Sequence, residues 1–153
     1  MLQIRRAQQK DIEALVRLTE EGKNYHNSLR PGYLSPINKD FHRNMLSENM
    51  RDENALVLIA ADNHQAVGML LAYFKNHPWL SRPSVCMLET LCIDQKFRHR
   101  GIGQKLMGFL EKVCADRKIA EIVLEVYQNN TIAADFYKKQ GYAVQSIKMT
   151  KKP

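Results

Sequence analysis

One predicted strand, residues 85–93, constrains the fold of this chain more than any other feature. Its apolar side chains are expected on two faces, one with Met87, Leu91 and Ile93 and the other with Cys86, Leu88 and Cys92. A strand that is buried on both faces belongs in the middle of a sheet that helices cover on each side. The sequence therefore predicts an α/β architecture.

The segments around this strand alternate as that architecture requires. Apolar residues at helical spacing predict helices over residues 11–22, 39–50, 101–118 and 130–139. Alternating or β-branched runs predict further strands over residues 2–6, 55–61, 66–74, 119–127 and 142–149. The element order β-α-α-β-β-β-α-β-α-β predicts an α/β fold with one mixed β-sheet and helices on both faces. We expect residues 1–153 to form a single domain.

Length and composition predict a soluble globular protein, and the odd number of cysteines suits a reducing cytoplasm. The chain has 153 residues, of which 44% are hydrophobic and 25% are charged. A chain of about 150 residues buries enough surface to hold a full core. Its longest apolar runs fall far short of the roughly 18 residues that a membrane helix needs, and charged residues interrupt any N-terminal signal peptide. We therefore expect no membrane partner.

The net charge of +7 favours an anionic partner without identifying it. Nucleic acid is disfavoured because zinc-finger spacing and paired RNP motifs are absent and the aromatic residues do not interleave with the basic cluster. The three cysteines form no CxxC pair, and the five histidines show no HxxxH or HxH spacing. We therefore expect neither a nucleic-acid partner nor a metal.

A basic loop joins the central strand to the next predicted helix, and this helix begins with two glycines, Gly101 and Gly103. The unpaired N–H groups and positive dipole end of a helix N-terminus attract phosphate, and glycine lets an anion approach the backbone. Taken alone, the loop also fits a tight turn with a solvated basic rim. A P-loop is excluded because GxxxxGK[ST] is absent, and Leu106 replaces the third glycine of a dinucleotide-binding GxGxxG.

Two short motifs lie at and after this loop. Arg98–Gly103 is similar to [QR]-x-x-G-x-[GA], and Asn130–Tyr142 is similar to N-x-x-A-x-x-[FL]-Y-x-x-x-G-[FY]. Both patterns are signatures of the GNAT superfamily of acyl-CoA-dependent N-acyltransferases, which the chain therefore resembles. The resemblance is densest over residues 86–142, and the predicted element order agrees with the GNAT fold.

The resemblance implies acetyl-CoA as co-substrate and no metal. In this family the central strand and the next one splay apart, pantetheine pairs with the strand edge, and pyrophosphate rests on the helix N-terminus. The residues implied to contact the cofactor are Leu91, Cys92, Ile93, Arg98, His99, Arg100, Gly101, Ile102, Gly103, Gln104, Asn130 and Tyr137. For Asn130, a role as a helix N-cap is compatible with that contact.

Two side chains are implied to act in catalysis. Tyr137 matches the family tyrosine that protonates the departing thiolate, and a phenol with a pKa of about 10 is protonated at neutral pH. Its alternative role is core packing. Glu89 lies in the otherwise apolar central strand, where we expect a buried carboxylate. The resemblance implies that Glu89 is the general base, and its alternative role is a structural pairing with backbone or arginine.

The implied activity is acetyl transfer from acetyl-CoA to a primary amine by direct attack in a ternary complex. A non-catalytic acyl-CoA-binding or scaffold module of the same fold is the alternative. The implied acceptor is a small-molecule amine or a protein amino terminus. Residues 22–36, with Tyr25, His26, Arg30 and Tyr33, are expected to shape its pocket. The sequence leaves open both the identity of the acceptor and whether the chain forms a homodimer.

Overall fold

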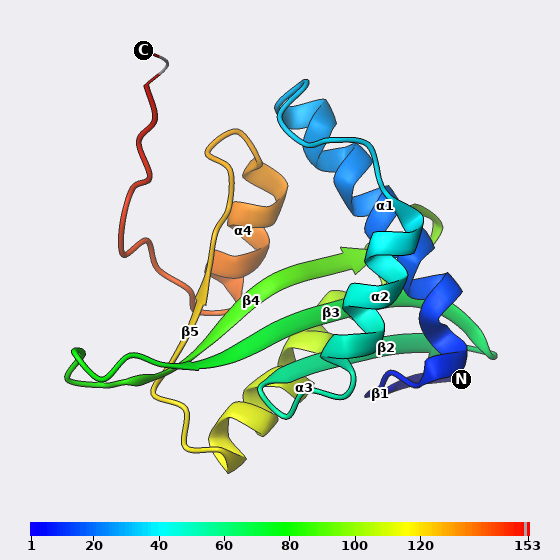
Figure 1. Ribbon diagram of the computed structural model, residues 1–153, viewed down its shortest axis with the longest axis horizontal. Helices are drawn as coiled ribbons and strands as arrows, with labels where there is room; N and C mark the ends of the chain where they lie inside the picture. Colours follow the sequence, from blue (N-terminus) through cyan, green and yellow to red (C-terminus); the bar gives the residue numbers. More distant parts are fainter. Residues whose placement is uncertain (152) are drawn as a thin grey trace.

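The computed structural model describes residues 1–151 and 153. The helices of the chain pack around one sheet (Figure 1). The strands are β1 (Leu2–Arg6), β2 (Ala55–Asp62), β3 (Gln65–Asn76), β4 (Ser84–Ile93) and β5 (Glu121–Leu124). The helices are α1 (Ile12–Leu29), α2 (Lys39–Asn49), α3 (Ile102–Asp116) and α4 (Thr131–Lys139). Short 3-10 turns at Gln9–Asp11 and Gln95–Phe97 precede α1 and α3.

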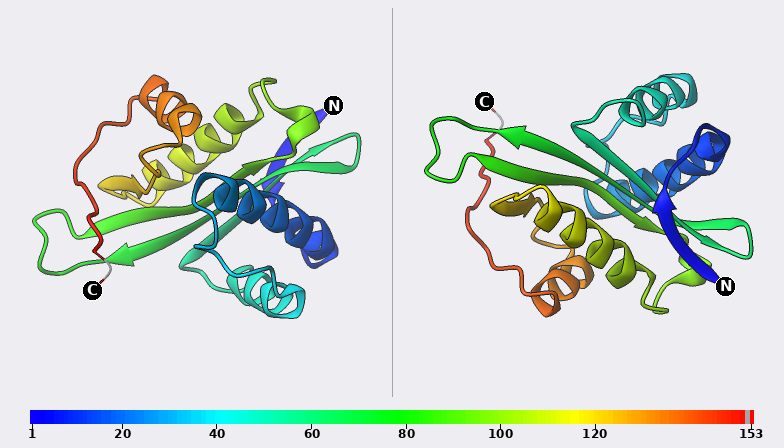
Figure 2. Two further views of the ribbon diagram at one scale, coloured as in Figure 1. Left: turned by 90° about the horizontal axis from the view of Figure 1, so that it is seen from above. Right: turned by 90° about the horizontal axis from the view of Figure 1, so that it is seen from below.

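The sheet is mixed and has the strand order β1-β2-β3-β4-β5. Strands β1 to β4 pair antiparallel with their neighbours, whereas β5 is parallel to β4. Helices α1 and α2 cover one face of the sheet, and α3 and α4 cover the other, as both views of Figure 2 show. The predicted mixed α/β architecture is therefore confirmed. No helix in the described residues is long and apolar enough to cross a membrane.

The two faces of the sheet carry separate cores. Six consecutive residues of β2, 55–60, are buried, because alternate side chains enter opposite cores. Val57 and Ile59 pack beneath α1 and α2, whereas Leu56 and Leu58 pack beneath α3. The continuous apolar runs of the inner strands thus reflect helices on both sides of the sheet.

A β-bulge interrupts the pairing of β4 with β3. Leu88 lies opposite Ala72 and Thr90 lies opposite Leu71, so Glu89 is the extra residue. The bulge shifts the alternation of side chains. Cys86 and Leu88 before it, and Leu91 and Ile93 after it, all contact the core on the α3 side. The two faces predicted for this strand are therefore wrong beyond Glu89, because strict alternation ends at a bulge.

The predicted last strand, residues 142–149, is absent. No backbone hydrogen bond involves residues 143–151, which we call the C-terminal segment. Its apolar side chains are open to solvent, with Val144, Ile147 and Met149 exposed by 76%, 82% and 88%. An apolar pattern alone does not make a strand, since a strand also needs a neighbour to bond to, and among the described residues the segment has none.

Helix α1 continues past Gly22, where the sequence predicted its end, and stops at Leu29. Glycine inside a helix costs about 1 kcal/mol relative to alanine, which tertiary contacts can offset. A Cβ at Gly22 would lie 3.5 Å from Cys92 Sγ, so the glycine allows α1 to pack closely on β4. The added helical turns place Tyr25 and His26 on a helix instead of in an irregular loop.

Candidate functional site

The chain turns sharply between the end of β4 and the start of α3. The Asp94 carboxylate accepts hydrogen bonds from the Lys96 amide at 3.1 Å and from Arg17 of α1 at 2.9 Å. Gly101 then caps α3 in a left-handed conformation with φ of 72°, a region that glycine enters without steric cost. The turn predicted from the glycine pair is thus present, and its left-handed backbone at position 101 favours glycine.

The first turn of α3 presents backbone N–H groups without acceptors. The Lys105 amide donates to the Gly101 carbonyl at 3.1 Å, and no side chain caps the helix. Among the residues described, no hydrogen bond involves the amides of Ile102, Gly103 and Gln104. Several exposed basic residues surround this turn: Lys96, His99, Arg100 and Lys105. Unpaired amides, the positive end of the helix dipole and basic neighbours together suit a phosphate group.

The side chain of Arg98 holds this turn against α1. Its Nε donates to the Ile93 carbonyl at 3.1 Å, and its guanidinium lies 3.4 Å from the Glu21 carboxylate. The same guanidinium lies over the ring of Tyr25, 5.5 Å from its centroid. The Arg98 amide donates to the Gln95 carbonyl at 3.5 Å, so both its side chain and its backbone have protein partners, and its contact with the cofactor stays a prediction.

Strand β5 stops pairing with β4 before β4 ends. Residues 85–88 lie opposite residues 121–124, and no described strand pairs with that edge of β4 beyond Leu88. Figure 1 shows the two strands diverging there. Leu91, Cys92 and Ile93, the predicted pantetheine contacts, belong to this open stretch, although the Cys92 side chain is buried against α1. A strand edge with free backbone groups can bind an extended ligand as an added strand.

Asn130 joins the start of α4 to α1. Its buried Oδ1 accepts a hydrogen bond from the Ala133 amide at 3.2 Å, which caps the helix, and another from the Tyr25 hydroxyl at 3.2 Å. The neighbouring Asn129 Nδ2 donates to the Leu29 carbonyl at 2.7 Å. The predicted cap is therefore present, and it also fixes the distance between two helices on opposite faces of the sheet.

Tyr137 lies on α4, half-buried on the α3 side of the sheet. Its ring packs edge-on against Phe136 and Tyr142, with centroid separations of 5.1 and 5.6 Å. Burial raises the pKa of Tyr137 to about 12. Phe136 packs close to the start of α3, since a Cβ on Gly103 would lie 3.3 Å from Phe136 Cζ. This contact links the helix that carries Tyr137 to the α3 N-terminus.

Glu89 is exposed, and the expectation of a buried carboxylate is wrong. As the extra residue of the bulge it lies where β5 no longer covers β4, so its carboxylate reaches water. No salt bridge in the described residues involves it. The pKa of nearby Tyr73 is raised, mainly by burial and further by the charge of Glu89. The Glu89 carboxylate thus has no salt-bridge partner among the described residues, and its role as a base stays a prediction.

Four aromatic side chains from distant segments meet beside the Asn130 cap. The His26 and Tyr127 rings lie 5.5 Å apart, the Tyr33 and Tyr127 rings 6.1 Å, and the Tyr25 and His26 rings 6.2 Å. Burial lowers the pKa of His26, which favours the neutral imidazole. The hydrogen bond between Tyr25 and Asn130 joins residues 105 positions apart, so no local sequence pattern could have indicated it.

The groups brought together fit the phosphate end of acyl-CoA. Three unpaired amides face the turn, and a Cβ at Gly101 would find no heavy atom within 4 Å, so the backbone is open to a ligand there. The described residues contain no group of three or more His, Cys, Asp or Glu side chains that could hold a metal ion.

The sequence model of the Acetyltransferase (GNAT) family matches residues 22–142. The chain belongs to this family. The match spans the turn before α3, the open part of β4 and the whole of α4, and it confirms the resemblance inferred from the two motifs. The family assignment accounts for the mixed sheet with helices on both faces.

Individual relatives agree with this assignment. The chain is 26% identical over 144 residues to the L-amino acid N-acetyltransferase AaaT of Escherichia coli K12, covering 93% of this chain and 83% of the relative. The tetramutant of the BH1408 protein from Bacillus halodurans has the same fold, with a TM-score of 0.90 and 21% identity over 99% of both chains. The structure of AAC(6')-Iy with a CoA-containing bisubstrate analogue aligns at a TM-score of 0.76 with 19% identity, over 100% of this chain and 99% of that one.

Proposed function

We propose that this GNAT-family chain is an N-acetyltransferase that moves an acetyl group from acetyl-CoA to a primary amine by direct attack in a ternary complex. One observation carries the proposal: the unpaired α3 amides lie beside an open edge of β4, and α4, which bears Tyr137, packs on the same α3 turn through Phe136. A strand edge, an anion-binding turn and a proton donor are the parts that this reaction needs.

The chain would hold acetyl-CoA mainly through its backbone. The pyrophosphate would accept hydrogen bonds from amides of Arg98 through Gln104, where Gly101 provides the left-handed turn. The pantetheine arm would extend the sheet beside Leu91, Cys92 and Ile93. The exposed cations of the turn, such as Lys105, would neutralise the remaining phosphate charge. Asn130 would contact the pantetheine arm through its Nδ2, because the helix cap and the Tyr25 contact use only its Oδ1.

In the transfer step, the amine nitrogen attacks the thioester carbon, the C–S bond breaks, and the sulfur leaves with the bonding electron pair. The Tyr137 hydroxyl donates its proton to that sulfur, and the pKa of about 12 keeps the proton on Tyr137 until negative charge develops. The attacking amine loses a proton to Glu89, directly or through water. Because Glu89 is exposed, it can exchange that proton with solvent after each turnover.

A covalent acetyl-cysteine intermediate is disfavoured by the state of Cys92, the cysteine at the open part of β4. Burial raises the pKa of Cys92 to about 11, so the thiol is protonated at neutral pH. The thiolate is the nucleophilic form of cysteine. Direct attack by the amine needs no such group.

The proposed acceptor is a small-molecule amine or a protein amino terminus. The similarity to an L-amino acid N-acetyltransferase makes L-amino acids the first candidates. The aromatic cluster of Tyr25, His26, Tyr33 and Tyr127 lies between α1 and the segment before α4, where it can border the acceptor. Thiol release from acetyl-CoA, measured with L-amino acids, simple amines, aminoglycosides and peptides with free amino termini, tests both the activity and the acceptor.

The Tyr137→Phe variant tests the proton donor, and Tyr142→Phe is its matched control. The Tyr142 hydroxyl is buried without a hydrogen-bond partner, so its removal leaves the neighbouring ring packing in place. We expect Tyr137→Phe to lower turnover by roughly 10²–10⁴-fold with little change in acetyl-CoA affinity by calorimetry, and Tyr142→Phe to retain turnover. Equal turnover in the two variants would contradict the proposed role of Tyr137.

A Glu89→Gln variant tests the base. Its turnover should fall near neutral pH and recover as the pH approaches the pKa of the free amine, because unprotonated amine then needs no base. Unchanged turnover at neutral pH would exclude Glu89 and make His26 the next residue to replace. If acetyl-CoA binds but no amine of the panel releases thiol, the alternative of a non-catalytic acyl-CoA-binding or scaffold module is favoured instead.

A further inference from the structure

A pocket lies at the end of the sheet away from the turn before α3. It has a volume of about 340 Å³, and its walls come from the residue before β2, the end of β3, the start of β4 and the chain after α3. Ser84, in its lining, begins β4, whereas Ile93 ends this ten-residue strand at the turn. At about 3.3 Å for each residue of a strand, roughly 30 Å separate the two places. The pocket is therefore distinct from the proposed acyl-CoA site.

The way in which α3 ends brings the Arg117 side chain to this pocket. Lys118, the next residue, has a left-handed backbone with φ of 56°, and its amide donates to the Ala115 carbonyl at 3.0 Å. The amide of Ile119 donates to the Cys114 carbonyl at 2.9 Å. These two bonds close the helix as a Schellman motif does. Because backbone amides already satisfy these carbonyls, the Arg117 guanidinium is not needed to cap them.

Two cations line the pocket without an anionic partner. The Arg117 guanidinium lies over the Phe74 ring, 4.1 Å from its centroid. Such stacking uses the face of the guanidinium and leaves the N–H groups at its edge, which can bind two oxygens at once. Lys75 of β3 is the second cation. Neither side chain forms a salt bridge in the described part of the chain, and no acidic residue there lines the pocket.

The rest of the lining is neutral, and hydrogen bonds join its walls. Asn54 and Asn76 contribute polar side chains, and Phe74 contributes apolar surface. The Phe74 amide donates to the Asn54 carbonyl at 2.8 Å, which ties β3 to the residue before β2. The Ser84 hydroxyl donates to the Lys118 carbonyl at 3.3 Å, which ties β4 to the chain after α3. A ligand would therefore meet walls that are already joined, and its binding would cost little ordering of them.

We propose that this pocket binds a small dianion, such as a phosphate monoester or a dicarboxylate. The two unpaired positive charges match two negative charges on one ligand. Arg117 would hold a pair of anionic oxygens through the edge of its guanidinium, and Lys75 would neutralise the remaining charge. The carbon atoms of the ligand would rest against Phe74 and Ile119. The volume lies within the range of about 300–1,000 Å³ that is usual for small-molecule sites.

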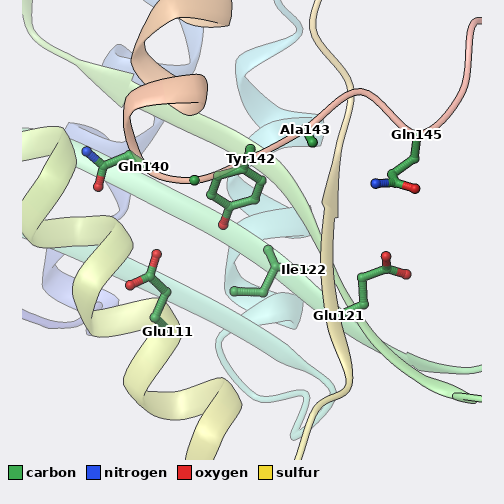
Figure 3. A pocket seen from close by; sticks show the side chains of 8 residues that line it. Glu111, Glu121, Ile122, Gln140, Tyr142, Ala143 and Gln145 are labelled. Carbon is green, nitrogen blue, oxygen red and sulfur yellow. The ribbon is translucent and has the colours of Figure 1, made fainter.

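Charge distinguishes this pocket from other places where a small molecule could bind. A pocket between α3, β5 and the residues after α4 is lined by Glu111 and Glu121, and no basic side chain of the described chain lines it (Figure 3). Its charge therefore disfavours an anion. The free amides at the start of α3 do attract phosphate, but acetyl-CoA would occupy them. A dianion bound at Arg117 should thus remain bound when acetyl-CoA is added.

Isothermal titration calorimetry of four full-length proteins tests this proposal, with glycerol 3-phosphate and succinate as probes and glycerol as the uncharged control. The wild type should bind at least one of the two dianions and no glycerol. Arg117→Gln and Lys75→Gln should each raise the dissociation constant by roughly tenfold or more, because each removes a charge-assisted contact. Lys112→Gln removes an exposed cation of α3 outside the pocket and is the matched control, which should bind as the wild type does.

Circular dichroism checks that the variants fold, which is expected because all three replaced side chains are exposed. Tighter binding of glycerol 3-phosphate would identify the ligand as a phosphate monoester, and tighter binding of succinate would identify it as a dicarboxylate. The absence of binding at millimolar concentrations of both dianions, their displacement by acetyl-CoA, or the same affinity in Arg117→Gln as in Lys112→Gln would each overturn the proposal. The comparison of the variants does not depend on the proposed acetyl transfer.

Discussion

Replacing Tyr137 by phenylalanine measures how much the burial of its hydroxyl changes the pH dependence of folding stability. Burial raises the pKa of Tyr137 from 10.0 to about 12, so the folded chain keeps the phenolic proton at pH values where the unfolded chain loses it. Because the unfolded state ionises first, the stabilisation from this group is complete below about pH 10 and is lost as the pH rises toward 12.

The size of this effect follows from the two pKa values. Folding stability should fall by about 1.4 kcal/mol at pH 11 and by about 2.7 kcal/mol once the pH is well above 12. Phenylalanine has no proton to lose in either state, and its ring keeps the packing against Phe136 and Tyr142. The wild type should therefore lose about 1.4 kcal/mol more than Tyr137→Phe between about pH 8 and pH 11.

Urea unfolding at these two pH values measures the difference. Tyr33→Phe serves as a control, because Tyr33 is 48% exposed. Buried groups that also ionise at high pH, such as Cys92 with a pKa of about 11, contribute to all three proteins alike. If the wild type and Tyr137→Phe lose the same stability, the hydroxyl is not buried as described and the argument for a retained proton fails.

Five further substitutions test the helix cap, the α3 turn and an ion pair. Asn130→Ala should lose about 1 kcal/mol of stability with the helix cap, while Asn130→Asp keeps a capping oxygen; urea unfolding compares them. Gly101→Ala should lower folding stability by about 1–2 kcal/mol, because alanine is strained in the left-handed conformation, although its Cβ meets no other atom. In Gly103→Ala, the added Cβ presses on the Phe136 ring. Calorimetry should show weaker acetyl-CoA binding for both variants. The Arg5 hydrogen bond lowers the pKa of Asp11, so the ion pair stabilises the fold above about pH 4 and this stabilisation is lost below it. In Asp11→Asn, folding stability measured by urea unfolding should therefore fall less between neutral and acidic pH than in the wild type.

Local periodicity predicted most of the helices and strands of this chain. β1 was predicted over the residues that form it, and α2 and α4 agree to within a residue at each end. These elements have regular apolar spacing and clear capping residues, so their formation depends on neighbours a few positions away. The two motifs likewise placed the α3 turn and the Asn130 cap correctly, because both are local backbone features.

The differences arise where distant contacts decide the outcome. Helix α1 passes Gly22 because β4 offers a close packing partner at Cys92. Glu89 is exposed because a bulge and the end of β5 coincide there. The segment after Tyr142 has strand-like composition, but its backbone bonds to no neighbour in the described part of the chain. None of these contacts has a counterpart in the local sequence pattern.

The bulge at Glu89 explains how one strand serves both the core and the site. Before it, β4 lies between β3 and β5 and its even-numbered residues Cys86 and Leu88 face α3; after it, the odd-numbered Leu91 and Ile93 take that side. One inserted residue thus keeps large side chains in the α3 core while β4 and β5 part. The backbone groups left free by that separation lie beside the unpaired amides of α3. One inserted residue in the central strand therefore accounts both for its apolar packing against α3 and for the strand edge that β5 leaves open.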